Sequence, residues 1–131
     1  MNAKKRILVA DDNIGIVVSL TMVLQYGGYE VASLMDGQEV MKISQHLPDL
    51  ILLDIWMAGI NGLDVCRYLK SNEETRNIPI IMISAYPDSD VSAREAGAND
   101  FIEKPYSMNY LLETVNKHLQ AATMNVASPA L

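Results

Sequence analysis

The stretch Leu50-Ile51-Leu52-Leu53-Asp54 decides the fold class, because it is a short apolar run that ends on a carboxylate. Pro48 precedes it and Gly59 follows it, and a run bounded in this way is typical of a strand buried on both faces. An ionised aspartate at the end of such a strand is costly to desolvate unless a partner compensates its charge. Taken alone, Asp54 could equally be a turn residue or a helix cap, so the rest of the chain must decide its role.

Other strand-like segments alternate with helical patterns along the chain. We predict strands at residues 7–10, 29–34, 50–54, 79–84 and 100–103. We predict helices from Ile14 to Gly27-Gly28, from Asp36-Gly37 to before Leu47-Pro48, from Asn61 or Gly62 to before Ser71, from a cap at Asp88-Ser89-Asp90 to Gly97, and from Ser107 to about Leu119. This alternation predicts an α/β fold in three layers, with a doubly wound, five-stranded parallel sheet between helices.

Length and composition limit the functional classes. The 131 residues suggest one domain, at 1–119, followed at 120–131 by a short tail or the start of a linker. The net charge of −6 argues against direct nucleic-acid binding and membrane-surface binding, which need clustered Lys and Arg. Cys66 is the single cysteine, so no internal disulfide is possible, which fits a reducing compartment. With no signal peptide and no spanning segment in the sequence, we expect a cytoplasmic protein.

Polar side chains follow four of the five predicted strands. They are Asp11 and Asp12 after the first strand, Asp54 at the end of the third, Ser84 at the end of the fourth and Lys104 after the fifth. Folds of this class bind ligands outside the carboxyl ends of the strands, where the strand order reverses. We therefore expect these side chains to meet at one rim.

Three neighbouring carboxylates need a cation to stay ionised, and oxygen ligands favour a hard ion such as Mg²⁺. A carboxylate held beside Mg²⁺ can attack a phosphoryl group and form an acyl phosphate. The Lys104 ammonium, the Ser84 hydroxyl and a nearby backbone N–H could then contact the phosphoryl oxygens. Each residue also has an ordinary explanation: the aspartate pair as a helix cap, Ser84 as a strand end, Lys104 as a surface charge. Their joint occurrence at successive strand ends favours the functional interpretation.

The sequence resembles the receiver domain of two-component response regulators, from Arg6 to about Leu119. The motifs that carry the resemblance are Ile7-Leu8-Val9-Ala10-Asp11-Asp12, Leu52-Leu53-Asp54-Ile55-Trp56-Met57 with Gly62 eight residues past the aspartate, Ile81-Met82-Ile83-Ser84-Ala85, and Gly97-Ala98-Asn99-Asp100-Phe101-Ile102-Glu103-Lys104-Pro105. The resemblance implies a flavodoxin-type, CheY-like (βα)5 fold and a role in phosphorelay signal transduction.

The resemblance also implies a role for each residue of the rim. Asp54 would be the phosphoacceptor for a sensor histidine kinase, a phosphotransfer protein or a small phosphodonor, and the chain would catalyse only its own phosphorylation and dephosphorylation. Mg²⁺ would be the cofactor, held by Asp12, by Asp11 through water, by Asp54 and by the backbone carbonyl of Trp56. Ser84, the backbone N–H of Ala85 and Lys104 would contact the phosphoryl group. No organic cofactor is expected.

A conformational switch is implied as well. Ser84 and Phe101 match the switch positions, and the peptide bond before Pro105 would be cis. The face formed by the fourth helix, fifth strand and fifth helix would present the signal and would be the surface for any homodimer. Two departures stand out: Ala58 replaces the usual proline and is expected to loosen the loop after Asp54, and Phe101 lacks the hydroxyl of the commoner tyrosine.

Three other functions can be compared with this one. A phosphatase of the haloacid dehalogenase type needs a second aspartate two residues after the nucleophile, where this chain has Trp56. A flavodoxin-like FMN carrier needs a Ser-, Thr- and Gly-rich loop after the first strand, whereas Asp11-Asp12 would repel a phosphate. A binding module that is never phosphorylated would not need Asp54, Ser84 and Lys104 together with the acidic pair.

Overall fold

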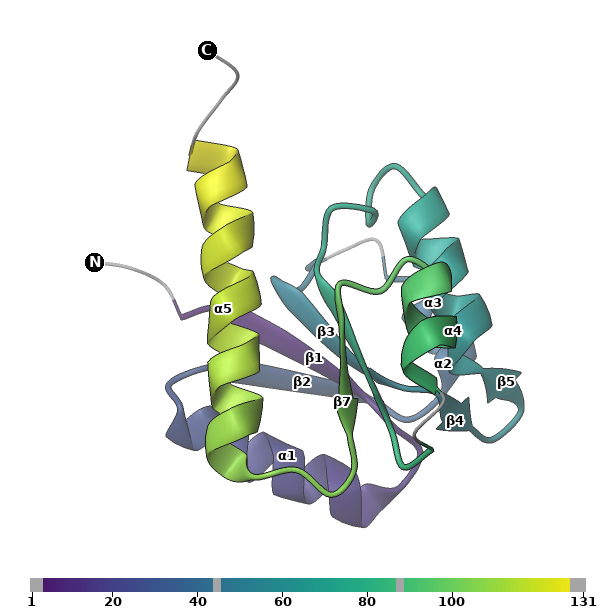
Figure 1. Ribbon diagram of the computed structural model, residues 1–131, viewed down its shortest axis with the longest axis horizontal. Helices are drawn as coiled ribbons and strands as arrows, with labels where there is room; N and C mark the ends of the chain where they lie inside the picture. The colour runs from purple at the N-terminus through teal and green to yellow at the C-terminus, as the bar shows by residue number, and fades with distance from the viewer. Residues whose placement is uncertain (1–3, 44–45, 87–88, 128–131) are drawn as a thin grey trace.

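The computed structural model describes residues 4–43, 46–86 and 89–127, with side chains described as far as Ala122. Its centre is a five-stranded parallel sheet in the order β2-β1-β3-β6-β7, with helices on both faces (Figure 1). The strands are β1 (Arg6–Ala10), β2 (Glu30–Leu34), β3 (Leu50–Asp54), β6 (Ile80–Ser84) and β7 (Asp100–Glu103). The predicted fold class is confirmed, and each predicted strand lies within one residue of the observed one.

Burial on both faces explains why the two inner strands, β3 and β6, have continuous apolar sequences. All five residues of β3 and all five of β6 are buried, because helices cover both faces of the sheet there. The register pairs Ala10 with Leu53 and Asp54 with Ile83, so the carboxyl ends of β1, β3 and β6 lie side by side. From β1 the chain first adds β2 on one side and then β3 on the other. The strand order therefore reverses between β1 and β3, and the switch point lies at their carboxyl ends.

Two apolar cores lie on opposite faces of the sheet. Helices α1 (Ile14–Tyr26) and α5 (Met108–Ala127) cover one face and contribute Val17, Leu20, Leu24, Leu111, Val115 and Leu119. Helices α2 (Gly37–Val40), α3 (Gly62–Ser71) and α4 (Ser89–Glu95) cover the other and contribute Val40, Val65, Cys66, Leu69 and Ala93. Cys66 is buried within this second core. None of the helices among the described residues combines the length and the apolar composition that crossing a bilayer requires.

Several predicted boundaries were wrong. The second helix is one turn long, because the N–H groups of Lys42 and Ile43 bond three residues back and tighten the chain out of the α-helix after Val40. Residues 56–61 form an unpredicted two-stranded antiparallel sheet, β4 (Trp56–Met57) with β5 (Ile60–Asn61).

Helix α5 continues to Ala127, so the first residues after Leu119 are helical. The proposed domain end at 119 stays a prediction. The predicted cap at Asp88 lies outside the described residues.

Candidate functional site

Three aspartates meet at the carboxyl edge of the sheet, as the sequence predicted. Each of Asp11, Asp12 and Asp54 offers a carboxylate oxygen, and these three oxygens lie within 4.8 Å of one another. Asp11 is 3% exposed and Asp54 is 8% exposed, while Asp12 is half-buried. The cluster forms because β1 and β3 are hydrogen-bonded neighbours whose ends are in register.

Backbone N–H groups orient each carboxylate. The Asn13 N–H donates to Asp11 Oδ1 at 2.9 Å, and the Trp56 N–H lies 3.4 Å from Asp54 Oδ1. The Ala58 N–H donates to Asp12 Oδ2 at 2.6 Å. A proline at position 58 has no N–H and could not make this bond. The replacement that was expected to loosen the loop therefore provides a bond between the loop and the acidic cluster.

Lys104 stands between two of the carboxylates. Its backbone N–H donates to the carbonyl oxygen of Ser84 at 2.9 Å, which fixes the start of the turn after β7 against the end of β6. From there its ammonium nitrogen lies 3.8 Å from Asp11 Oδ2 and 3.9 Å from Asp54 Oδ1. One cation thus faces two buried anions, with Asp12 as a third acidic neighbour.

The cluster is electrostatically strained when no other cation is bound. Burial, together with the nearby charge of Asp11, raises the pKa of Asp54 to about 6 against the attraction of Lys104. Burial is also the main cause of the raised pKa of Asp11, although the Asn13 N–H and Lys104 oppose it. Ionising Asp11 and Asp54 therefore costs free energy in the folded state, and a bound cation would reduce that cost.

The donor set fits Mg²⁺. The carboxylates of Asp11, Asp12 and Asp54 supply hard oxygen atoms from one small region, which is what a divalent cation that keeps part of its water shell accepts. Burial, with the charges of the neighbouring aspartates, raises the pKa of Asp11 and of Asp54, and a bound cation would offset both effects. These aspartates would hold the ion, together with the expected carbonyl of Trp56.

Comparison with known proteins identifies the family. The sequence pattern of the response regulator receiver domain matches residues 7–116. The chain is 38% identical over 120 residues to the DNA-binding response regulator MtrA of Mycolicibacterium paratuberculosis, covering 89% of this chain and 52% of MtrA. The chain belongs to the response regulator receiver domain family. It spans about half the length of this curated relative, and it takes part in phosphorelay signalling.

Solved structures agree with this assignment. A response regulator from Chloroflexus aurantiacus matches with a TM-score of 0.86 and 30% identity, covering 90% of this chain and 99% of that one. The receiver domain of the sensor histidine kinase PA1611 from Pseudomonas aeruginosa matches with a TM-score of 0.82 and 25% identity, covering 90% and 99% of the two chains. That structure has a magnesium ion coordinated in its active-site cleft.

Ser84 lies at the end of β6 in this receiver domain and is 1% exposed. Its Oγ accepts the Tyr86 N–H at 3.1 Å and lies 3.3 Å from the Ser89 hydroxyl at the start of α4. The sequence did not single out Ser89, because a serine at a helix start is ordinarily only a cap. This contact links the phosphoryl-binding candidate Ser84 to the helix expected to carry the signal.

Two aromatic rings stand beside the acidic cluster. Trp56, in β4, and Tyr86, after β6, are both exposed, and their ring centroids are 5.8 Å apart in an edge-to-face arrangement. Each of them donates its backbone N–H to a site residue two positions earlier, Asp54 or Ser84. The ring contact therefore joins the segment after Asp54 to the segment after Ser84.

Phe101 and Pro105 match the expectations for the switch region in part. The Lys104–Pro105 bond is cis, as the resemblance implied. Phe101 is half-buried beneath α4 and lines a pocket of about 420 Å³ with Asp90, Glu103, Pro105, Tyr106, Ser107 and Tyr110. This hollow gives the Phe101 ring adjacent space.

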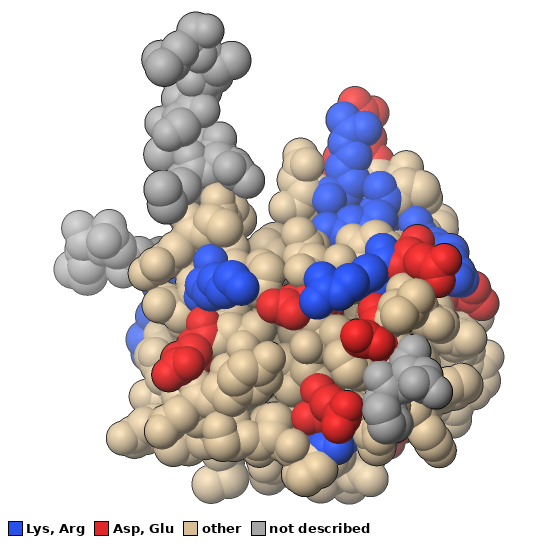
Figure 2. All heavy atoms as spheres, viewed as in Figure 1, with Lys and Arg blue, Asp and Glu red and all other residues tan. Residues whose placement is uncertain are grey.

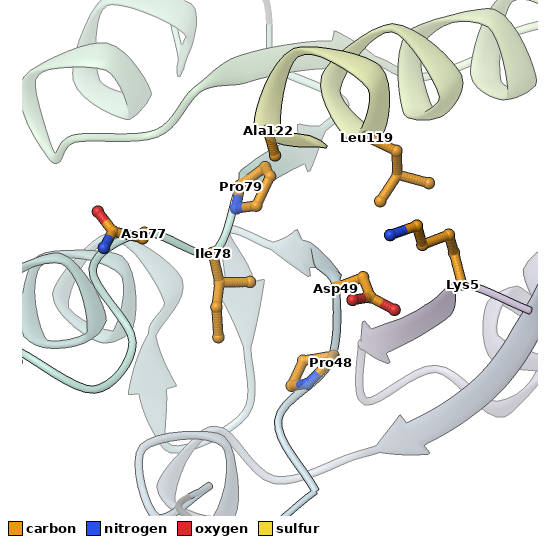
Figure 3. A pocket seen from close by; sticks show the side chains of 8 residues that line it. All are labelled: Lys5, Pro48, Asp49, Asn77, Ile78, Pro79, Leu119 and Ala122. Carbon is orange, nitrogen blue, oxygen red and sulfur yellow. The ribbon is translucent and has the colours of Figure 1, made fainter. Parts of the chain in front are cut away.

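Another pocket lies at the opposite edge of the sheet. It has a volume of about 290 Å³ and lies between α5 and the amino ends of β1, β3 and β6 (Figure 3). Its lining residues are Lys5, Pro48, Asp49, Asn77, Ile78, Pro79, Leu119 and Ala122. The lining contains one cation and one carboxylate and none of the predicted site residues, so it is separate from the phosphorylation chemistry.

Proposed function

We propose that Asp54 accepts a phosphoryl group from the phosphohistidine of a sensor histidine kinase or a phosphotransfer protein, or from a small phosphodonor. The observation that carries the proposal is the cluster of three carboxylates with the Lys104 ammonium beside Asp11 and Asp54. No other group of three potential metal ligands of this kind occurs among the described residues.

The chemistry follows from the placement of these groups. An Asp54 carboxylate oxygen attacks the phosphorus, the P–N bond to the donor imidazole breaks, and the nitrogen keeps the electron pair. Lys104 then pairs with one phosphoryl oxygen, while the Ser84 hydroxyl and the Ala85 N–H donate to another. The chemistry that Mg²⁺ supplies when bound is charge neutralisation beside Asp54 and at a phosphoryl oxygen. The chain thereby catalyses its own phosphorylation and, with water as the attacking group, its own dephosphorylation.

Intact-mass measurement after incubation with acetyl phosphate tests this assignment. In Mg²⁺ the parent chain should gain about 80 Da, the mass of one phosphoryl group, and should gain far less when the metal is chelated. Asp54→Asn should remain unmodified. Asp64→Asn is the matched control, because Asp64 is an exposed aspartate on α3 paired with Arg67. A phosphoryl adduct on Asp54→Asn equal to that of the control would refute the role of Asp54.

Phosphorylation would switch the α4–β7–α5 face. The Ser84 hydroxyl would move toward a phosphoryl group on Asp54, and this movement would break its contacts with the Tyr86 N–H and the Ser89 hydroxyl. The Phe101 ring would then rotate toward the space that Ser84 leaves, since packed side chains rearrange between discrete positions. This face would bind the output partner and would pair two phosphorylated copies.

Backbone and side-chain NMR shifts test the switch. Phosphorylation should shift Phe101 and Tyr106 as well as the residues around Asp54. Ser84→Ala, which removes the hydroxyl, should leave Asp54 phosphorylated but should reduce the shifts at Phe101. Shifts confined to the surroundings of Asp54 in the parent chain would contradict this route.

A further inference from the structure

A short hydrogen bond ties the β4–β5 hairpin to the acidic cluster. The Ala58 N–H donates to Asp12 Oδ2 at 2.6 Å, a length typical of the strong bonds that an ionised acceptor makes. With this bond in place, Asp12 is half-buried and its carboxylate already lies in the cluster with those of Asp11 and Asp54. The bond therefore holds Asp12 in an orientation that converges with the other two aspartates.

Both ends of the hairpin are fixed beside Asp54. β4 begins two residues after Asp54, and Gly62, which follows β5, donates its N–H to the carbonyl of Ile55 at 2.7 Å (Figure 1). A Cβ atom on Gly62 would collide with the Asp54 carbonyl oxygen, so the chain returns directly against the end of β3. The tip of the hairpin contacts Asp12 at the end of β1. The hairpin thus connects the two strand ends that carry the acidic cluster.

The hairpin offers Asp12 a backbone donor and no cationic side chain. Residues 56–61 include no Lys, Arg, Asp or Glu. Figure 2 shows the result: the surface over β4 and β5, at the lower right, consists mostly of uncharged residues. Among the described residues, the group that donates a hydrogen bond to the Asp12 carboxylate is the Ala58 N–H. The orientation of Asp12 therefore depends on position 58.

We propose that the Ala58 N–H is a positioning group for Asp12 in the magnesium site, a role that rests on the function proposed above. An ionised carboxylate has two oxygen atoms and about four acceptor sites, so Asp12 can accept the Ala58 N–H and hold an ion at the same time. Mg²⁺ demands near-ideal octahedral geometry, so a carboxylate that is already held in place binds it better than one that must first be ordered. The bond should therefore persist when Mg²⁺ binds and should raise the affinity for the ion.

Ala58→Pro removes this bond with little other change, because proline has no N–H. Ala58 and Gly59 are the central residues of the turn between β4 and β5. Gly59 has a φ of 79°, typical of the third residue of a type II turn, and proline is common at the residue before it. Ala58 is exposed, so the added ring would meet solvent. Ala58→Val is the matched control, since valine keeps the N–H and adds as many carbon atoms as proline does.

Titration with MgCl2, followed by NMR at the Asn13 amide, tests the proposal. This N–H contacts Asp11 Oδ1 at 2.9 Å, on the β1 side of the cluster, so it reports on the ion without belonging to the hairpin. Ala58→Pro should raise the dissociation constant for Mg²⁺ about tenfold, the lower end of the loss expected when a partner of a metal ligand is removed. Ala58→Val should bind Mg²⁺ as the parent does.

Hydrogen exchange of the Ala58 amide in the parent gives a second measurement that needs no variant. If the bond favours Mg²⁺ binding, then Mg²⁺ must favour the bond by the same factor, because the coupling of two equilibria is reciprocal. Exchange of this amide should therefore slow when Mg²⁺ is added.

Two results would overturn the positioning role. The first is Mg²⁺ binding by Ala58→Pro that is as tight as in the parent, or tighter. The second is faster exchange of the Ala58 amide in Mg²⁺, which would mean that the bond and the ion compete for Asp12. If Asp12→Ala loses Mg²⁺ binding while Ala58→Pro keeps it, only the role of Ala58 is rejected. A parent chain that binds no Mg²⁺ would reject the proposed magnesium site as well.

Discussion

At the amino edge of the sheet, the partly buried charges of Lys70 and Asp100 have close partners, whereas at the carboxyl edge three carboxylates face one another. The Lys70 ammonium donates to the carbonyls of Arg76 and Ile78 and to Asn99 Oδ1, at 3.3, 2.9 and 2.7 Å. Asp100 lies 2.8 Å from the His118 ring nitrogen. In the acidic cluster at the other edge, backbone N–H groups contact the carboxylates, and the cation paired with them among the described residues is Lys104, 3.8 Å from Asp11 and 3.9 Å from Asp54.

The pKa values express the same contrast. Burial alone would raise the pKa of Asp100, but the His118 hydrogen bond and the Phe101 N–H outweigh it, so this pKa is lowered. Asp54, buried among like charges, has its pKa raised to about 6. Asp100 at the amino edge therefore contributes to stability, although burial lowers the pKa of the Lys70 ammonium at the same edge. The ionised Asp11 and Asp54 at the carboxyl edge oppose folding, a cost that the proposed binding of a cation would offset.

The largest stability effect is expected at the carboxyl edge. Asp54→Asn should raise the free energy of unfolding at pH 7, without Mg²⁺, by roughly 1–3 kcal/mol, because it removes a buried charge whose pKa is raised. In the parent, the protonated Asp54 gives stability that is fully present below about pH 4 and is lost as the pH rises through about 6. The gain from the variant should therefore shrink toward pH 4. Urea unfolding at both pH values measures it, and a loss of stability at pH 7 would contradict the account.

At the amino edge the opposite sign is expected. Asn99 Oδ1 accepts both the Lys70 ammonium and the Ile80 N–H. Asn99→Ala leaves both donors with fewer partners and should lower the free energy of unfolding by roughly 1–2 kcal/mol. Asn116→Ala, at an exposed position of α5, is the control and should change little. Equal unfolding midpoints for the two variants would show that the Lys70–Asn99 contact does not contribute to stability.

The contrast shows what the sequence could and could not predict. Strands such as β3 and β6 were predictable because both-face burial requires continuous apolar runs. The rim residues were predictable because parallel strands in this topology end at one edge. The short second helix was missed, since Val40, Met41 and Ile43 have helical spacing whether or not the backbone continues as an α-helix.

Contacts between distant residues carried no sequence signal. Lys70 and Asn99 are 29 residues apart, and nothing local to either residue indicates the pair. The Ala58 N–H bond to Asp12 spans 46 residues and depends on the β4–β5 hairpin, whose two-residue strands are too short to show a pattern. Asp54, Ser84 and Lys104 were indicated by their chemistry at successive strand ends, whereas the switch role of Phe101 rests on the resemblance, because nothing local to that residue indicates it.

A smaller effect is expected from the two rings beside the site. Trp56 and Tyr86 should limit the approach of water to a phosphoryl group on Asp54, and neither supplies a carboxylate or amide to position that water. The aspartyl phosphate should therefore decay slowly, and Trp56→Asn combined with Tyr86→Ala should speed its decay severalfold. Phosphoryl loss followed by mass in Mg²⁺ measures this. Decay in the double variant no faster than in the parent would exclude shielding by these rings.

The most direct test of the contrast between the two edges is the effect of Mg²⁺ on stability. A ligand that binds only the folded state raises the free energy of unfolding by an amount set by its concentration and affinity, about 1–3 kcal/mol at ten to a hundred times its dissociation constant. The parent chain should show such a gain in urea titrations. Asp12→Ala, which removes one proposed ligand, should lose most of it, and Asp64→Ala should keep it. Equal Mg²⁺ stabilisation of the parent and Asp12→Ala, or none in the parent, would contradict the account.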